Sequence, residues 1–366
     1  MATHFEPGHV IANRFRVERL LAFGGMGSVY AVEDITVGRA YVLKTLHGEL
    51  GGDCELRRQM HQEARVLGRI DHVNIVRVFT AGVTDDQQAL PFLVMEKLEG
   101  ASLRQILRAG GRIPARAAVR AVVDLLHALD HVHEIGIVHC DLKPENIFFH
   151  KDRNGVTPKL LDFGVVRVLP RGEANAKLGG TLRYASPEQI KGEGVGPRSD
   201  VYSMALVLYE MLAGVSPFHD ATGASAIVRA QLQRTPPAIA GLPSGLMRLL
   251  QRALSKDPSE RPRDAFAFAR ELKDVERTLE GPREVDEKLL AARAKCDEQT
   301  RVKEKDADET VRDLTTMVSD GDLETRGATA ERVEGAGVSG AEPLTERPRY
   351  ATWDAGGGGR CDGLRP

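Results

Sequence analysis

The sequence predicts an α+β fold in which a small β-rich lobe precedes a larger helical lobe and a tail of low order. Three observations support this prediction. Short apolar runs separated by glycine-bearing turns fill residues 15–45, as in an antiparallel sheet. Beyond Gly100, apolar residues recur every three or four positions, the spacing of one helix face. From about residue 276 the chain is rich in charged residues, glycine and threonine, and cannot bury enough apolar area to offset its ordering entropy.

The bulk composition is that of a folded protein without a global charge bias. The 366 residues are 42% hydrophobic and 28% charged, and 50 basic residues nearly balance 52 acidic ones. This balance gives no indication of nucleic-acid binding or of an anionic membrane partner. The four cysteines form no C-x-x-C pair, as expected of reduced thiols. We predict no signal peptide and no membrane span, and expect a cytoplasmic protein.

The expected elements follow the chain in a simple order. In the first lobe, at about 15–98, we expect strands around 15–17, 29–32 and 41–43, a helix over 55–70, and strands over 75–80 and 92–96. In the second lobe, at about 99–272, we expect helices after Pro114 and over 199–213, 245–254 and 264–275. The expected low-order tail covers 276–366.

The segment from His139 to Asn146 is the most informative in the chain. Its sequence is HCDLKPEN, and Asp162-Phe163-Gly164 follows 16 residues later. Two carboxylates, one ammonium and one amide, on a loop fixed by proline, can orient a hydroxyl and hold magnesium on a nucleotide. Isolated Asp, Lys and Asn residues in a loop are more often solvated, but this complete order is highly specific. The segment therefore predicts phosphoryl transfer.

This order resembles the catalytic and magnesium-binding loops of protein kinases, and is closest to the eukaryotic-like serine/threonine kinases of bacteria. The resemblance covers about residues 15 to 272. It implies the bilobal protein kinase fold, ATP and Mg²⁺ as cofactors, and protein serine or threonine as acceptor. It also implies that Asp141 accepts or orients the substrate hydroxyl proton and that Lys143 neutralises charge near the γ-phosphate. The implied magnesium ligands are Asn146 and Asp162.

A glycine-rich run lies between two predicted strands, ahead of Lys44. Glycines would let its backbone N–H groups approach phosphate oxygens. An ordinary glycine-rich hairpin is the alternative, and the position of the run ahead of Lys44 favours a nucleotide. The run comprises Leu21, Ala22, Phe23, Gly24, Gly25, Met26, Gly27, Ser28 and Val29.

Lys44 ends an apolar strand, and Glu63 lies in the helix predicted after it. By resemblance, the two form the activating ion pair of a kinase, with Lys44 on the nucleotide phosphates. The alternative is that both are solvent-facing charges, the usual state of these residue types.

The segment from Leu93 to Gly100 resembles the kinase segment that links the lobes. Met95 would then be the gatekeeper, and the Glu96 carbonyl and Leu98 amide would hydrogen-bond adenine. Core packing is the alternative role for Met95. The side chains expected to enclose the adenine faces are Val29, Val42 and Phe148.

Three residues depart from the family pattern. Ala22 stands at the first loop glycine, and its methyl group would cost about 1 kcal/mol or more only at positive φ. Val42 replaces a small alanine above adenine. Cys140 replaces the arginine that receives a phosphate of the activation loop. Residues 165–179 also contain no serine, threonine or tyrosine, so we expect activity without activation-loop phosphorylation.

These departures leave a second function open, a nucleotide-binding pseudokinase that acts as a signalling scaffold. Cys140 could also be a redox switch, although buried cysteines are usually inert. Against a decayed kinase stand the retained residues Lys44, Glu63, Asp141, Asn146 and Asp162.

The resemblance assigns further positions after the activation segment. Thr181 would face the substrate, Glu188 would pair with Arg261, and Asp200 would anchor the catalytic loop from a buried helix start. His127, His131 and His133 are not expected to bind a metal, because a fourth ligand is missing. In the tail, Thr310 begins a T-x-x-D sequence favoured by phosphothreonine-reading domains, with an inert tail as the alternative.

Overall fold

The protein is described by a computed structural model. The structure describes residues 5–23, 27–47, 54–86, 89–163, 181–283 and 285, all within the first of two compact units, residues 1–306. The strands are β1 (Val10–Ile11), β2 (Phe15–Phe23), β3 (Gly27–Asp34), β4 (Arg39–Leu46), β5 (Val78–Val83), β6 (Pro91–Glu96), β7 (Gly100–Ser102), β8 (Ile147–Asp152) and β9 (Gly155–Leu160). The helices are α1 (Cys54–Leu67), α2 (Leu103–Gly110), α3 (Ala115–Glu134), α4 (Pro187–Lys191), α5 (Pro197–Ala213), α6 (Ala224–Gln233), α7 (Ser244–Ala253) and α8 (Ala265–Glu276). Three short 3-10 turns are η2 (Pro144–Asn146), η4 (Thr181–Arg183) and η5 (Pro258–Glu260).

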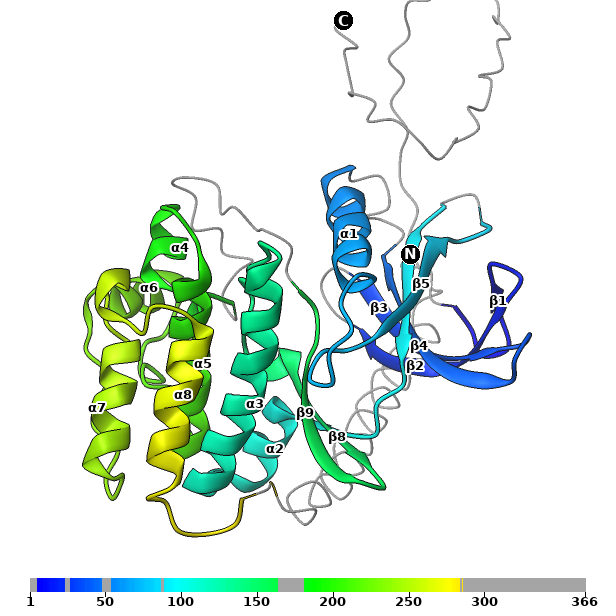
Figure 1. Ribbon diagram of the computed structural model, residues 1–366. Coiled ribbons are helices and arrows are strands. Elements are labelled where there is room, and N and C mark those ends of the chain that lie inside the picture. The colour runs from blue at the N-terminus through cyan, green and yellow to red at the C-terminus, as the bar shows by residue number, and fades with distance from the viewer. Residues whose placement is uncertain are drawn as a thin grey trace, which may run out of the picture. The chain divides into compact units, whose positions relative to one another are not determined.

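The first lobe is an antiparallel sheet in the order β1-β2-β3-β4-β6-β5, with α1 packed against β5 and β6 (Figure 1). This confirms the expected sheet with a single helix. Two bounds were wrong. The strand expected over 75–80 is β5 and begins at Val78, because Ile75 makes only an isolated bridge to Leu160. The helix expected to reach residue 70 ends at Leu67, where Gly68 follows.

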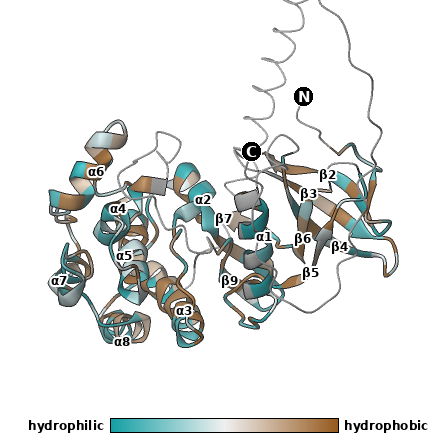
Figure 2. Ribbon diagram, turned by 90° about the horizontal axis from the view of Figure 1, so that it is seen from above, coloured by the Kyte–Doolittle hydropathy of each residue, from teal (hydrophilic) through white to brown (hydrophobic). Residues whose placement is uncertain are grey.

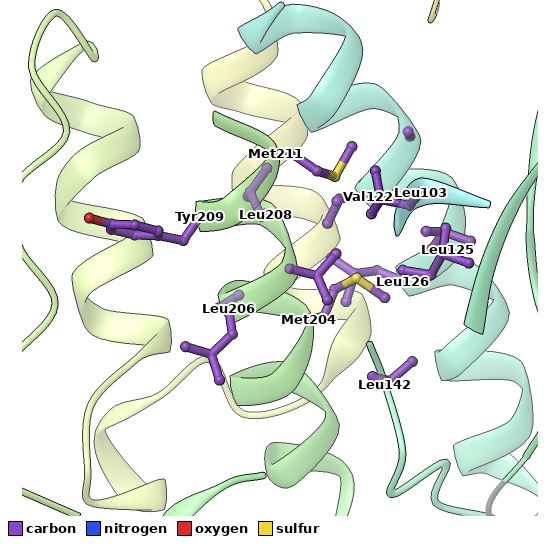
Figure 3. Packing of buried hydrophobic residues seen from close by; sticks show 14 of the residues in the cluster. Leu103, Val122, Leu125, Leu126, Leu142, Met204, Leu206, Leu208, Tyr209 and Met211 are labelled. Carbon is purple, nitrogen blue, oxygen red and sulfur yellow. The ribbon is translucent and has the colours of Figure 1, made fainter. Parts of the chain in front are cut away.

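The second lobe is built around α5, which contacts α3, α7 and α8 (Figure 3). Every residue of α5 from Ser199 to Leu212 is buried, so this stretch of the helix has no solvent-exposed face. Hydrophobic residues recur along α3, whose expected apolar face is confirmed (Figure 2). The side chains of this core include Leu103, Val122, Leu126, Leu142, Met204 and Leu208.

Several elements of the second lobe were not predicted. They include a small antiparallel sheet, β7-β8-β9, and the helices α2, α4 and α6. A local signal for α2 was present, because Ser102 and Gln105 form a capping box at its start. This sheet positions the site, since β8 begins directly after Asn146 and β9 ends just before Asp162.

Packing continues beyond the point where we expected it to stop. Leu279 and Val285 are buried in the core of the second lobe, and the side chain of Glu276 is also buried. Residues 286–366, including Thr310, lie outside the described residues. Among the helices of the described part of the chain, none has the length and apolar character needed to cross a membrane.

Candidate functional site

Three charged side chains meet where the two lobes face each other. Lys44 Nζ on β4 lies 3.3 Å from Glu63 Oε1 on α1 and 2.8 Å from Asp162 Oδ1, which follows β9. The side chain of Glu63 is only 12% exposed and that of Lys44 is 25% exposed. The alternative that both are solvent-facing charges is therefore wrong.

The three side chains of this triad differ in their protonation at neutral pH. Burial raises the pKa of the Glu63 carboxyl to about 7, although Lys44 acts in the opposite direction. Burial also opposes the charges of Lys44 and Asp162, but their mutual attraction outweighs it, so the pKa of Lys44 is raised and that of Asp162 is lowered. Lys44 and Asp162 are thus charged at neutral pH, and Glu63 titrates there.

A second group of side chains forms in the loop between α3 and β8. Lys143 Nζ lies 2.7 Å from Asp141 Oδ2, and Asn146 donates to that same oxygen at 3.1 Å and to the Asp141 carbonyl at 2.9 Å. The other carboxylate oxygen, Asp141 Oδ1, is buried and has no hydrogen-bond partner in the described part of the chain. Such an oxygen is suited to receive a proton.

Asp200 anchors the backbone of this loop. It is fully buried in the first turn of α5, where the helix dipole favours a carboxylate. Its oxygens accept hydrogen bonds from the N–H groups of His139 (2.8 Å) and Cys140 (3.0 Å), and lie 2.8 Å from His133 Nε2. The expected anchoring of the loop by Asp200 is confirmed.

Cys140 sits in a strained backbone conformation. Its φ is +63°, in the left-handed region that non-glycine residues seldom adopt. Besides the contact from Asp200, the side-chain amide of Gln189 donates to the Cys140 carbonyl at 2.8 Å. Burial raises the pKa of the Cys140 thiol to about 12, with Asp200 and Asp141 adding to the effect. The thiol is therefore protonated at neutral pH, which argues against a redox switch.

The expected pair of Glu188 and Arg261 is also confirmed. Two hydrogen bonds of 2.8 and 2.9 Å join the guanidinium to the carboxylate, and the Arg261 side chain is fully buried. Arg261 also donates to the carbonyls of Ser255, Arg198 and Lys256, so its three remaining hydrogens are used. The segment after the activation loop is thereby fixed to the region before α8.

Phe163 links the triad to the loop. Its ring is 2% exposed and lies 4.5 Å from the His139 ring, while His139 Nε2 lies 3.2 Å from the Leu161 carbonyl. Asp162 itself has a φ of +43°. These contacts, with the strained turn, direct the Asp162 carboxylate toward Lys44.

Two of the side chains expected around adenine, Val29 and Val42, share one face of the first sheet. Val29 pairs with Lys44, and Val42 pairs with Met95, so all four point to the same side. Val29 and Val42 are half-buried, as is Phe148 on β8. Met95 is also a core residue, packed with Met60 and Leu93.

The segment between the lobes keeps a backbone donor available. In the described part of the chain, the Leu98 N–H has no hydrogen-bond partner. The carboxylate of Glu96 is used structurally, since it accepts from Lys159 Nζ at 2.7 Å and from the Arg77 N–H at 2.9 Å.

The glycine-rich run is described at its two ends only. Ala22 lies in β2 with extended backbone, so its methyl group costs little there. Leu21 and Phe23 are exposed, whereas Ser28 is buried. A Cβ at Gly27 would stand 2.1 Å from the Thr45 carbonyl oxygen, so only glycine fits where β3 approaches β4. Gly24, Gly25 and Met26 lie outside the described residues.

The donor set of the site fits magnesium. In the described part, neither Asn146 Oδ1 nor Asp162 Oδ2 has a hydrogen-bond partner. Asn146 bonds to Asp141 through its side-chain nitrogen, and Asp162 accepts from Lys44 through Oδ1. Amide and carboxylate oxygens are the ligands that Mg²⁺ prefers, with water and phosphate oxygens completing its shell. Among the described residues, no three His, Cys, Asp or Glu side chains form a metal-binding group, and the three histidines of α3 point to separate contacts.

Sequence reasoning missed one group of polar residues beside the catalytic loop. Arg104 on α2 contacts Glu145, Glu210 and the hydroxyl of Tyr184. These four residues lie far apart in the chain, and no local pattern joins them. Thr181, expected to face the substrate, begins η4 three residues before Tyr184.

Comparison with known proteins supports a single family. The family model of the protein kinase domain matches residues 15–273. Serine/threonine-protein kinase pkn2 of Myxococcus xanthus is 36% identical over 271 residues, which cover 71% of this chain and 32% of that protein. Serine/threonine-protein kinase PksC of Streptomyces coelicolor is 38% identical over 261 residues, covering 68% and 46%. The chain thus spans about a third to a half of the length of these relatives.

Solved structures agree with these relatives. The kinase domain of PknI from Mycobacterium tuberculosis is 26% identical, with a TM-score of 0.59, and the match covers 75% of this chain and all of that domain. The fold is therefore the bilobal kinase fold, with a β-rich first lobe and a helical second lobe. Because the family model of the protein kinase domain matches 259 residues, more than half of the sequence, the chain belongs to the protein kinase family.

Proposed function

We propose that this protein is a serine/threonine protein kinase that transfers the γ-phosphoryl group of ATP to protein hydroxyls. One observation carries the proposal. Groups from both lobes converge on Asp162 and Asp141, and each is of the type that phosphoryl transfer needs. The printed names of the bacterial relatives, serine/threonine-protein kinases, support the choice of acceptor.

The residues divide the chemistry between them. Lys44, held by Glu63, binds the nucleotide phosphates, and the glycine-rich run covers them. The acceptor hydroxyl gives its proton to Asp141 as its oxygen bonds to the γ-phosphorus and the bond to the ADP oxygen breaks. Lys143 forms an ion pair with Asp141 and neutralises charge on the transferred group. Thr181 would help to position the acceptor.

Asn146 and Asp162 would hold Mg²⁺. When bound, the metal neutralises charge on the nucleotide phosphates. Adenine would lie between Val29, Val42 and Phe148, with hydrogen bonds to the Glu96 carbonyl and the Leu98 N–H.

The test is transfer of label from γ-labelled ATP to a general protein substrate in the presence of Mg²⁺. Wild type should incorporate label, while Asp141→Asn and Lys44→Met should lose nearly all of it. Matched controls are Asp152→Asn and Lys191→Met, both on the surface, which should behave as wild type. Wild type that binds ATP but incorporates no more label than Asp141→Asn, with both at background, would support the scaffold pseudokinase instead.

We further propose that activity does not depend on phosphorylation of the activation loop. The thiol of Cys140 cannot bind a phosphate as an arginine does, and residues 165–179, outside the described residues, offer no hydroxyl. Asp200 and Gln189 hold the Cys140 backbone without any phosphate. Phosphatase-treated protein should keep its activity. Loss of activity together with a phosphate mapped to residues 165–181 would contradict this proposal.

The tail carries a sequence that would link the kinase to partners. Thr310 lies in a T-x-x-D sequence, and we propose that the kinase phosphorylates it and so creates a site for a phosphothreonine-reading domain. Mass spectrometry after incubation with ATP should find phosphate on the segment 276–366 in wild type. A fully unmodified tail would favour the inert alternative.

A further inference from the structure

A buried glutamine of α6 lies between the core helix α5 and the turn η4. Gln231 is 1% exposed, and the other buried residues of α6, Ile227 and Ala230, are apolar. A buried amide is costly unless it is hydrogen-bonded, so an apolar residue would suit this position better if packing were the only requirement. The presence of Gln231 must therefore be explained by the groups that it bonds.

The side-chain amide of Gln231 bonds to both neighbours. Its Oε1 accepts from the Tyr202 hydroxyl on α5 at 2.7 Å. Its Nε2 donates to the Arg183 carbonyl of η4 and lies 3.5 Å from the Leu182 carbonyl. Because a carbonyl can only accept, the amide nitrogen must face η4 and the amide oxygen must face Tyr202. Gln231 thus joins η4 to the core helix in one orientation.

Tyr202 has further partners of its own. Lys256 Nζ donates to the Tyr202 hydroxyl at 2.9 Å, and the Arg261 guanidinium lies 4.7 Å from the centre of the ring. Burial raises the pKa of Tyr202, so its hydroxyl stays a neutral donor to Gln231. We call the hydrogen bonds that run from Lys256 through Tyr202 and Gln231 to η4 the relay. The relay connects the region before α8 with η4 through the core of the second lobe.

The far end of the relay is the segment proposed to receive the acceptor. η4 begins at Thr181, and the two carbonyls that face Gln231 belong to the next two residues. The Arg183 side chain donates to the carbonyls of Phe218 and Ala221 at 3.0 and 2.9 Å. The backbone of η4 is therefore fixed by α6 on one side and by the segment before α6 on the other.

The relay does not extend to the nucleotide side. In the described part of the chain, Gln231 makes no hydrogen bond to the catalytic loop or to the triad around Lys44. Loss of its amide should therefore disturb η4 and leave the groups around ATP in place. This separation distinguishes a role in acceptor binding from a general role in the fold.

We propose that Gln231 is a positioning residue for the acceptor, because its amide holds the carbonyls of η4 where the protein substrate is received. The inference rests on the proposed kinase activity. It assigns a role to a residue that touches neither ATP nor the reacting atoms. The KM for a protein substrate should then depend on Gln231, whereas the KM for ATP should not.

The test is Gln231→Met, an apolar change of similar length, assayed with casein as the protein substrate. The KM for casein should rise about tenfold, as for the loss of one or two buried hydrogen bonds. The KM for ATP, and the rate of ATP hydrolysis with water in place of a protein hydroxyl, should stay within about twofold of wild type. Gln233→Met changes an exposed glutamine of the same helix, and this matched control should leave all three quantities as in wild type.

A purely structural Gln231 gives a different result. In that case Gln231→Met lowers ATP hydrolysis and casein phosphorylation by the same factor, and the inference is overturned. An unchanged KM for casein would overturn it as well. If Gln231→Met does not fold, Tyr202→Phe decides, because it keeps the ring and removes only the hydroxyl from the relay. A rise of about threefold in the KM for casein, with the KM for ATP unchanged, then supports the inference, and equal KM values contradict it.

Failure of the proposed function can be told apart from failure of this inference. Amide hydrogen exchange, measured without ATP or casein, does not require catalysis. Residues 181–184 should exchange about fivefold faster in Gln231→Met than in wild type, while residues 139–146 exchange at the wild-type rate. Without phosphotransfer by wild type, this result would still support the relay. Equal exchange of residues 181–184 in the two proteins would contradict it.

Discussion

The charged groups of the site fall into two regions that differ in burial. On the nucleotide side, the side chains of Lys44, Glu63 and Asp162 are 12–42% exposed. The second region, which we call the support, is the pair that fixes the segment after the activation loop, and its side chains, Glu188 and Arg261, are no more than 6% exposed. Both regions are ion pairs at about 3 Å, so distance alone does not distinguish them.

The difference in burial indicates which charged groups contribute to stability and which are available to bind a ligand. A charge that leaves water completely needs a partner in the folded state, and loss of that partner is costly. A partly exposed charge is stabilised by water when its partner is lost, so it contributes little to stability and remains free to bind a ligand. We therefore expect the support to determine whether the protein folds and the nucleotide side to determine whether it reacts.

The largest effect on stability is expected for Arg261→Ala. This change leaves the Glu188 carboxylate buried without its partner, and should lower the free energy of unfolding by about 3–5 kcal/mol. Urea denaturation followed by circular dichroism measures it. Arg263→Ala is the matched control, because its side chain is 74% exposed, and should change the free energy by less than about 0.5 kcal/mol. Equal effects of the two changes would remove the contrast between the regions.

Lys44→Met should show the opposite profile. Loss of the ammonium should lower phosphotransfer by about 10²–10³-fold, the size expected for one preorganised charge at a reacting group. Its cost in unfolding free energy should stay below about 1 kcal/mol, because the triad is partly exposed. Parallel kinetics and denaturation on one protein preparation test both numbers. A large fall in the free energy of unfolding would show that the nucleotide side also contributes to the stability of the fold.

The two regions were also predictable from the sequence to different degrees. Residues 139–146 and Asp162 to Gly164 are short, ordered sequences, so their chemistry can be recognised before any fold is known. Resemblance then supplied Glu188 with Arg261, and Asp200, all of which the structure confirms. Burial of the Glu188–Arg261 pair could not be predicted locally, since the two residues lie 73 positions apart in the chain.

Other features depend on tertiary contacts that no window of sequence contains. Ile75 is a β-branched residue in a run that is typical of a strand, but it makes only an isolated bridge to Leu160. The strand β5 therefore begins at Val78 and not at the predicted residue 75. The Arg104 cluster joins residues up to 106 positions apart. Leu279 and Val285 belong to a polar stretch, yet are buried because the core of the second lobe extends over them.

A pH experiment sharpens the view of the nucleotide side. Because burial places the pKa of Glu63 at about 7, its carboxylate takes up a proton below that pH and weakens its attraction for Lys44. The kcat/KM for ATP, which reports on the free enzyme, should therefore fall by about tenfold from pH 8 to pH 6. Stability should move the other way, since the contribution of the protonated group is present at low pH and is lost as the pH rises through about 7.

Glu63→Gln should remove this acid limb and give a lower, flat profile. Glu33→Gln changes a more exposed glutamate of the same lobe, paired with Arg16, and should retain the wild-type pH profile. An acid limb that persists unchanged in Glu63→Gln would assign the titration to another group.

The smallest effect is expected at the exposed edge of the nucleotide side. Ala22→Gly restores the glycine of the family pattern, but the Ala22 backbone is already extended within β2 and needs no positive φ. The KM for ATP should therefore change by less than about threefold, while the added backbone freedom lowers stability by about 0.5–1 kcal/mol. Steady-state kinetics over a range of ATP concentrations and a thermal unfolding curve measure these two quantities. A tenfold fall in KM would mean that the β-methyl of Ala22 hinders the phosphates, and that even this exposed edge is shaped as tightly as the buried support.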